Sequence, residues 1–191
     1  IKVLNLPLTA QLDKRLIINE IRLLACHNCI YFIDYSTVFL RNNTIYIVME
    51  YASKGDLAQL IKKQQINNVK FTDAEVFNYF IQIAQAIKYL HKHNIIHRDI
   101  KSANIFIDDN NKLKLGDFGV IKILQSYAMQ ANTQIGTPYY MPPEIYRYQR
   151  YNTKFDIWSL GCVLYEMMTY YPPFMGKTLV DLKYKIFTGK Y

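Results

Sequence analysis

Two short polar stretches carry side chains that could act together in a chemical reaction. Residues 97–104 read His-Arg-Asp-Ile-Lys-Ser-Ala-Asn, and residues 117–119 read Asp-Phe-Gly. Carboxylate and amide oxygens are the ligands that Mg²⁺ prefers, and the ion completes its coordination with water and phosphate oxygens. An aspartate and an asparagine from the two stretches could therefore hold magnesium, while a second aspartate accepts a proton from a hydroxyl group. Either stretch alone is common by chance, whereas both together in this order form a specific pattern.

The pattern resembles the catalytic loop and the metal-binding motif of protein kinases. The resemblance implies an enzyme that transfers the γ-phosphoryl group of ATP to protein hydroxyl groups, with ATP and Mg²⁺ as cofactors. Asp99 would be the catalytic base, and Asn104 and Asp117 the metal ligands. Lys101 stands where serine/threonine kinases carry a lysine, and its charge would stabilise the moving phosphoryl group. The alternative is a pseudokinase, a kinase-shaped binding module or scaffold without phosphoryl transfer.

The same resemblance identifies a lysine that would contact the phosphates and a glutamate that would pair with this lysine. Ile1-Lys2 is similar to the end of the Val-Ala-Ile-Lys strand, so Lys2 would steady the α- and β-phosphates. Glu20 shares the apolar face of a helix expected over residues 9–25. A carboxylate that faces a core needs a cationic partner, and we expect that partner to be Lys2. Alternatively, Glu20 lies at the rim of this face and reaches water.

A second group of residues resembles the hinge and the pocket that bind adenine and ribose. Backbone groups of Glu50 and Ala52 would bind the base edge. Asp56 would bind the ribose, although it could equally cap a helix that begins at Leu57. The residues implied in this pocket are Met49 (the gatekeeper), Glu50, Ala52, Asp56 and Phe106 (the apolar floor).

Residues 117–144 resemble an activation segment. Thr133 stands where related kinases are phosphorylated, and a phosphate there could pair with Arg98; the alternative is an unmodified polar residue. Thr137 would bridge Asp99 and Lys101. Glu144 would anchor the segment, in a Pro-Pro-Glu sequence that departs from the family only at its first position.

Within the kinases, the chain resembles the NIMA-related family. The stretches that carry this resemblance are residues 19–25, 47–52, 115–119 and 136–141. Protein substrates with serine or threonine follow from it, as does dimerisation through segments outside this chain. A cytoplasmic location is expected, with the cytoskeleton, centrosome and cilium as candidate places of work.

Local patterns predict the elements that must position these residues. Residues 44–50 are β-branched and aromatic and predict a strand. Residues 72–92 predict a helix, because Thr72 and Glu75 form a capping box and an apolar stripe follows. Residues 155–168 are apolar on nearly every side, which is typical of a helix inside a core. By the resemblance, Asp156 at its start would bond the backbone of the catalytic loop.

The order of these elements predicts an α+β, bilobal, protein-kinase-like fold. Residues 1–50 would form a small β-rich lobe with one helix, and residues 51–191 a larger, mainly helical lobe. The chain starts without an initiator methionine or a leader pattern. We therefore expect a Gly-rich phosphate loop before Ile1 and further helices after Tyr191. On its own, the chain is expected to be inactive or poorly stable.

Composition bears on the remaining classes of function. The net charge of +8 could suggest a nucleic-acid-binding module, but the basic residues are spread along the chain, so we expect no nucleic acid. No apolar run approaches the roughly 18 residues of a membrane span, so we expect no membrane insertion. Cys26 and Cys29 alone are weak evidence for zinc, and we interpret them as packing residues at a helix end.

Overall fold

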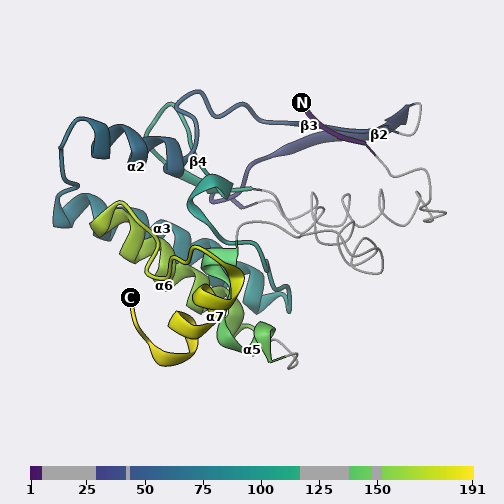
Figure 1. Cartoon of the computed structure of the whole chain (residues 1–191). Helices are drawn as coiled ribbons and strands as arrows, with labels where there is room; N and C mark the ends of the chain where they lie inside the picture. Colours follow the sequence, from purple (N-terminus) through teal and green to yellow (C-terminus); the bar gives the residue numbers. More distant parts are fainter. Residues whose placement is uncertain (6–28, 42–43, 117–137, 148–151) are drawn as a thin grey trace.

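The computed structural model describes residues 1–5, 29–41, 44–116, 138–147 and 152–191. A small sheet lies above a group of helices, so the fold is α+β, as the sequence predicts (Figure 1). Several sequence predictions concern residues outside the described ranges. These are the helix at residues 9–25 with Glu20, and Asp117, Thr133 and Thr137.

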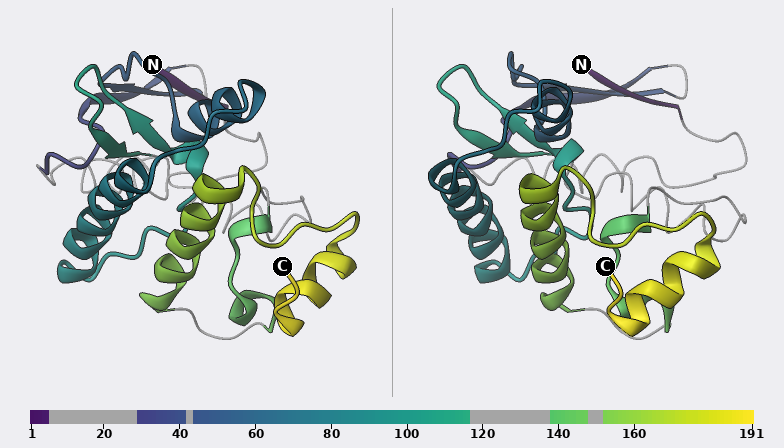
Figure 2. Two further views of the ribbon diagram at one scale, coloured as in Figure 1. Left: turned by 90° about the vertical axis from the view of Figure 1, so that its left-hand side faces the viewer. Right: turned by 60° about the vertical axis from the view of Figure 1, so that its left-hand side comes forward.

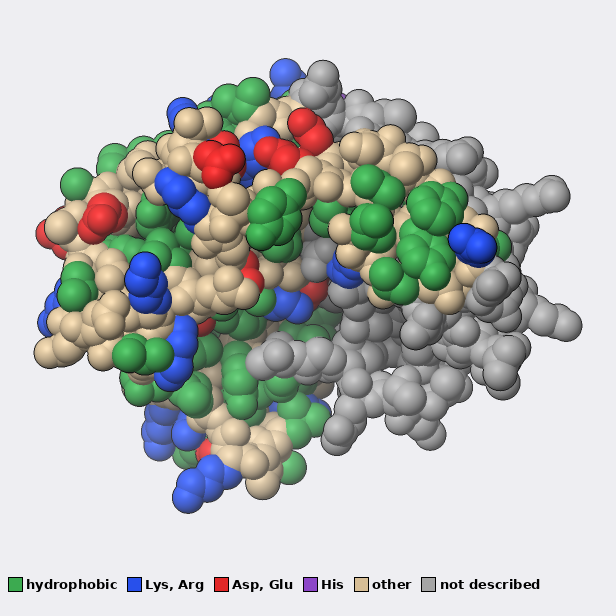
Figure 3. Space-filling model, turned by 90° about the horizontal axis from the view of Figure 1, so that it is seen from above, with side chains coloured by type: hydrophobic (Ala, Val, Ile, Leu, Met, Phe, Trp, Pro, Cys, Tyr) green, Lys and Arg blue, Asp and Glu red, His purple; other side chains and the backbone are tan. Residues whose placement is uncertain are grey.

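The small sheet contains three antiparallel strands in the order β1-β3-β2. Their bounds are Lys2–Asn5 for β1, Tyr35–Arg41 for β2 and Thr44–Met49 for β3. Strand β3 confirms the prediction for residues 44–50, and it buries Ile45 and Ile47 on one face. Val3 and Phe39 lie exposed, and hydrophobic side chains are visible when the molecule is seen from above (Figure 3). On this face, Lys and Arg side chains are dispersed among other residues.

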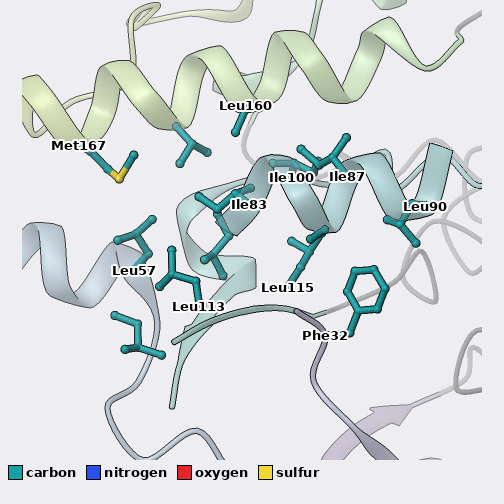
Figure 4. Close-up of a cluster of buried hydrophobic side chains, with 14 of the residues drawn as sticks. Phe32, Leu57, Ile83, Ile87, Leu90, Ile100, Leu113, Leu115, Leu160 and Met167 are labelled. Carbon is teal, nitrogen blue, oxygen red and sulfur yellow. The ribbon is translucent and has the colours of Figure 1, made fainter. Parts of the chain in front are cut away.

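Two long helices form the centre of the larger part and lie side by side (Figure 2). Helix α3 spans Asp73–Lys92, and Thr72 caps it through the capping box that the sequence predicts. Helix α6 spans Lys154–Thr169 and confirms the second helix prediction. Buried side chains of both helices meet those of α2 (Leu57–Ile66) and of neighbouring short strands (Figure 4).

One face of α6 departs from the expected burial. Ile157 is 47% exposed and Met168 is 61% exposed, although this helix was expected to be buried all round. The two residues lie about three helical turns apart, so they share one face. Phe155, Val163 and Met167 are buried as expected. The prediction was therefore wrong for one stripe of the helix, because none of the described elements covers it.

Short elements surround the two long helices. In chain order they are η1 (Ser102–Asn104), β4 (Ile105–Ile107), β5 (Leu113–Leu115), η3 (Pro138–Tyr140), α5 (Pro143–Tyr146) and α7 (Leu179–Thr188). Strands β4 and β5 form an antiparallel hairpin. Helix α7 buries Leu182 and Ile186 against Phe174 in a separate small cluster. Among the described residues, no helix is both long enough and apolar enough to cross a membrane.

Residues 29–34 connect the small sheet to the helical part. Phe32 is 2% exposed and forms a parallel bridge with Leu115 of β5. The Ile33 N–H donates to the Leu115 carbonyl at 3.0 Å, and the Leu115 N–H donates to the Tyr31 carbonyl at 2.7 Å. These contacts position β5, which leads directly to the predicted metal ligand Asp117.

Candidate active site

The catalytic loop is held by a carboxylate that is completely buried. Asp156, in the first turn of α6, is 0% exposed. It accepts hydrogen bonds from the backbone N–H groups of His97 and Arg98, both at 2.9 Å, and contacts His91 Nε2 at 2.8 Å. A buried carboxylate is costly unless it is hydrogen-bonded, and these contacts meet that requirement. The expectation that Asp156 bonds the loop backbone is confirmed.

The backbone turns sharply at Arg98, where φ is 67°. This left-handed conformation costs a residue with a β-carbon about 1–3 kcal/mol, so the surrounding contacts must stabilise it. The turn lets two successive N–H groups reach the same carboxylate. The Arg98 side chain is exposed, and its pairing with a phosphate on Thr133 stays a prediction.

His97 joins the loop to the end of β5. Its imidazole is buried, with Nε2 at 3.1 Å from the Gly116 carbonyl and Nδ1 at 3.3 Å from the Asp99 N–H. A carbonyl only accepts and a backbone N–H only donates, so the neutral ring with its proton on Nε2 fits both contacts. The Gly116 N–H donates to the Asn104 carbonyl at 2.9 Å, which ties the two segments a second time.

Three predicted catalytic residues meet at the Asp99 carboxylate. Its Oδ2 atom accepts from Lys101 Nζ at 3.1 Å and from Asn104 Nδ2 at 2.8 Å. Asn104 Nδ2 also donates to the Asp99 carbonyl at 2.8 Å. Within the described part of the chain, no hydrogen bond uses Asp99 Oδ1 or Asn104 Oδ1. The carboxylate therefore keeps one oxygen that can accept a proton.

Asn104 has the features of a magnesium ligand. The hydrogen bonds of its amide nitrogen to Asp99 leave the Oδ1 atom available, and a side-chain amide oxygen is a suitable donor to Mg²⁺. The second predicted ligand, Asp117, follows Gly116 directly but lies outside the described residues. The one predicted metal ligand that the structure describes, Asn104, therefore fits Mg²⁺.

The predicted hinge leaves two backbone groups available for a base. The Glu50 N–H donates to the Asp34 carbonyl at 2.8 Å, and the Ala52 carbonyl accepts from the Gly55 N–H at 3.2 Å. No hydrogen bond between described residues uses the Glu50 carbonyl oxygen or the Ala52 N–H. Met49, the predicted gatekeeper, ends β3 and is half-buried.

The predicted floor of the pocket lies close to the hinge and to β5. Phe106 in β4 is half-buried and forms an antiparallel bridge with Asp56. A β-carbon on Gly116 would lie 2.6 Å from the Phe106 ring, so these two residues are in close contact. The Asp56 carboxylate accepts from the Gln59 N–H at 2.8 Å. Its capping of α2 is thus confirmed, and its contact with ribose stays a prediction.

The remaining predicted residues are placed as follows. Lys2 pairs in register with Ile47 in the sheet, while its expected partner Glu20 lies outside the described residues. Glu144 is half-buried in α5, and none of the ion pairs between described residues involves it. Cys29 is partly buried against the hydrophobic core, in agreement with the packing interpretation.

The sequence analysis missed a buried polar cluster behind the loop. Glu166 of α6 accepts from the Tyr140 hydroxyl at 2.7 Å and from Ser102 Oγ at 3.1 Å. Burial raises the pKa of Glu166, and burial together with the Glu166 carboxylate raises the pKa of Tyr140. The cluster links η1 of the catalytic loop to η3. A glutamate within an apolar helix was the sequence signal that could have revealed it.

The sequence analysis also missed an ion pair at the hinge. Lys114 Nζ of β5 lies 2.6 Å from Glu50 Oε1 and 2.7 Å from Glu50 Oε2. Glu50 Oε2 also accepts from the Asp34 N–H at 3.2 Å. Sequence patterns could not reveal this pair, because the two residues are 64 positions apart and each resembles an ordinary surface charge.

An open groove runs beside the catalytic loop. It has a volume of about 580 Å³ and lies between α2 and Ala103, the residue before Asn104. Its lining includes Lys62 and Lys63 along with the apolar Ile66.

Comparison with known proteins reveals consistent similarities. The family described as protein kinase domain matches residues 1–189. The probable serine/threonine-protein kinase nek3 of Dictyostelium discoideum is 44% identical over 177 residues, which cover 91% of this chain and 16% of that protein. Serine/threonine-protein kinase Nek3 of Mus musculus is 48% identical over 145 residues, 76% of this chain and 28% of that protein. Nek2 of Homo sapiens is 38% identical over 198 residues, 100% of this chain and 44% of that protein. The chain thus spans less than half the length of these relatives.

Proposed function

Since this chain belongs to the protein kinase family and is similar to Nek serine/threonine kinases, we propose that the protein phosphorylates serine and threonine in other proteins. The observation that carries the proposal is the arrangement around Asp99. One oxygen of its carboxylate is oriented by Lys101 and Asn104, and the other oxygen takes no hydrogen bond from the described residues. This arrangement suits a base that accepts the proton of a hydroxyl group.

The proposed reaction is an in-line phosphoryl transfer. The substrate hydroxyl oxygen bonds to the γ-phosphorus of ATP as its proton passes to Asp99 Oδ1. The bond from the γ-phosphorus to the bridging oxygen breaks, and its electron pair leaves with ADP. Lys101, 3.1 Å from Asp99, supplies positive charge next to the moving group. Charge stabilisation of this kind accounts for much of the catalysis in such transfers.

The metal and the nucleotide are held by other residues in this proposal. Asn104 Oδ1 and Asp117 would bind Mg²⁺, which neutralises phosphate charge when bound. The Glu50 carbonyl and the Ala52 N–H would bind the adenine edge, with Phe106 beneath it. Lys2, paired with Glu20, would contact the phosphates.

Protein substrates and the setting of the reaction belong to the same proposal. The groove between α2 and Ala103 would take the chain that flanks the acceptor hydroxyl. Phosphorylation of Thr133, with Arg98 as its partner, would order the activation segment, and Thr137 and Glu144 would support it. We also propose a cytoplasmic place of work and dimerisation through segments outside this chain, as the resemblance to NIMA-related kinases implies.

The test measures ³²P transfer from ATP to a generic basic protein by the full-length protein, followed by phosphoamino-acid analysis. Asp99→Asn should lower kcat by about 10²–10⁴-fold, because it removes the proton acceptor. Asp73→Asn, an exposed change in the first turn of α3, serves as the matched control and should have no effect. Binding of ATP without transfer by the wild-type protein would support the pseudokinase alternative. Unchanged activity of Asp99→Asn would show that another residue is the base.

A further inference from the structure

The hinge residue Glu50 is held by two segments that are distant in sequence. Both oxygens of its carboxylate contact Lys114 Nζ, at 2.6 and 2.7 Å. Residue Asp34 is bonded to it twice, since the Asp34 N–H donates to Glu50 Oε2 at 3.2 Å and the Asp34 carbonyl accepts from the Glu50 N–H at 2.8 Å. We refer to Glu50, Lys114 and Asp34 as the hinge clamp.

This ion pair lies in a partly buried setting, unlike a typical surface pair. The Lys114 side chain is 15% exposed and the Glu50 side chain 27% exposed. Fully exposed pairs contribute little, because water and salt screen them and because two long side chains must be ordered. A lysine that contacts both oxygens of a carboxylate at short distance, away from most solvent, is much less affected by these losses.

The clamp leaves one polar group of Glu50 without a partner. Its N–H and both carboxylate oxygens have partners, whereas no described residue bonds its carbonyl oxygen. Because the amide group and the side chain are both held, the α-carbon of Glu50 is fixed, and with it the position of the carbonyl carbon. This carbonyl is one of the two groups proposed to bind adenine.

Lys114 also belongs to the strand pair that supports the predicted adenine floor. It lies opposite Phe106 in the register of β4 and β5. One residue pair of this hairpin therefore both holds the hinge and carries the ring under the base. A displacement of Lys114 would affect two sides of the same pocket.

We propose that Lys114 is a positioning residue for the nucleotide: through Glu50 it fixes the hinge carbonyl that selects adenine. The inference rests on the proposed kinase function, since it concerns the same pocket. It assigns Lys114 an effect on nucleotide affinity and base choice without contact with the nucleotide. An ordinary structural ion pair would instead affect only the stability of the fold.

The experiment compares variants of the full-length protein with respect to ATP and GTP. Lys114→Met keeps an unbranched, flexible side chain but removes the charge. We expect KM for ATP to rise about tenfold with kcat within about twofold of wild type, and the preference for ATP over GTP to fall by a similar factor. The Kd of a fluorescent ATP analogue should rise in parallel. Lys114→Arg retains a cation that can contact both carboxylate oxygens, so it should preserve most of the affinity.

A matched control and a second variant allow for loss of folding. Lys112→Met changes an exposed lysine of the same hairpin, and none of the ion pairs between described residues includes Lys112; KM should not change. If Lys114→Met does not fold, Glu50→Gln weakens the same pair from the other side. Glu50→Gln should likewise raise KM for ATP.

The outcomes separate this inference from the proposed function. If the wild-type protein transfers phosphate and Lys114→Met lowers Tm without changing KM or Kd, the positioning role is wrong and the kinase function stands. If the wild-type protein binds ATP without transferring phosphate, the proposed kinase function is wrong. The Kd of the fluorescent ATP analogue, compared between wild type and Lys114→Met, then still decides whether Lys114 is a positioning residue. A wild-type protein that binds no nucleotide would overturn both.

Discussion

The contact between Gly116 and Phe106 leaves no room for a side chain at residue 116. A β-carbon there would lie 2.6 and 2.9 Å from two ring carbons of Phe106 and 3.3 Å from the Ile33 side chain. Gly116→Ala therefore should displace the ring, lower the free energy of unfolding by about 1–3 kcal/mol and raise KM for ATP. Urea denaturation and ATP titration measure the two effects.

A matched control for this prediction lies in α6. Among the described residues, apart from the two chain neighbours and the backbone of α6 itself, no atom lies within 4 Å of a β-carbon built on Gly161. Gly161→Ala should therefore stabilise the chain slightly, by up to about 1 kcal/mol, through helix propensity. Equal losses of stability in the two variants would contradict the steric argument. Recovery of stability in the double variant Gly116→Ala, Phe106→Leu would support it.

The buried Glu166 carboxyl predicts a pH dependence of stability. Burial raises its pKa above the ordinary value of 4.5. The folded chain thus binds this proton more tightly than the unfolded chain, so this group's contribution to stability falls as pH rises from about 4.5 through the raised pKa. Glu166→Gln removes the titration but keeps an acceptor for Tyr140 and Ser102.

Thermal unfolding of wild type and Glu166→Gln from pH 5 to pH 8 tests this prediction. The Tm of the variant relative to wild type should increase with pH, because only the wild type pays for an ionised buried carboxylate. A constant difference in Tm across this range would show that the carboxyl titrates as in water.

At the scale of elements, α3 depends on its capping box. Thr72 Oγ1 accepts from the Glu75 N–H at 3.2 Å, and Glu75 Oε2 accepts from the Thr72 N–H at 2.8 Å. Thr72→Ala should lower the free energy of unfolding by about 1 kcal/mol at pH 7, measured by urea denaturation.

The same capping box should make this difference sensitive to pH. The Thr72 N–H, and after it the Thr72 hydroxyl at 2.8 Å from Glu75 Oε2, lower the pKa of Glu75, and Thr72→Ala removes only the hydroxyl contribution. The stabilisation that this carboxylate gives is present above its unfolded pKa and is lost as pH falls through its folded pKa. The difference between wild type and Thr72→Ala should therefore shrink in acid. A difference that grows in acid would contradict this assignment of the cap.

Elements with a local signature could be predicted from the sequence. The capping box and apolar stripe predicted α3, the β-branched run predicted β3, and the apolar run predicted α6. The resemblance to a kinase catalytic loop likewise singled out Asp99 and Asn104, two side chains that the structure brings into contact. In each case, the information lies within one element or one loop.

Features that depend on distant residues could not be predicted. The Glu50–Lys114 pair joins positions far apart, and neither residue has a distinctive neighbourhood in sequence. The periodicity of α6 predicts a helix but not which neighbour covers each face, so the exposure of Ile157 and Met168 was missed. Both features depend on how separate elements pack against one another, and local sequence patterns do not contain this information.

At the scale of the whole molecule, Phe32 couples the small sheet to the helical core. Its ring packs edge-on against Tyr89, with centroids 5.5 Å apart, and its segment hydrogen-bonds to β5. Phe32→Ala should lower the free energy of unfolding by about 3–5 kcal/mol. It should also separate the loss of far-UV circular dichroism from the loss of Trp158 fluorescence during denaturation, because this tryptophan of α6 stacks on Phe174 and reports on the helical part alone.

An exposed aromatic of the sheet provides the control for this prediction. Phe39 stacks on Tyr46 and is 43% exposed to solvent. Phe39→Ala should change stability by less than about 1.5 kcal/mol, with both signals still lost together. Coincident transitions in Phe32→Ala would mean that the two parts unfold as one unit without this ring.

The burial of Asp156 has a consequence for amide hydrogen exchange. Loop amides usually exchange with deuterium quickly, because small local openings expose them. The amides of His97 and Arg98 instead donate to the completely buried carboxylate of Asp156, in the first turn of α6. They should exchange only when the helices around them separate, as slowly as amides in the middle of α3, even though both residues lie in a loop.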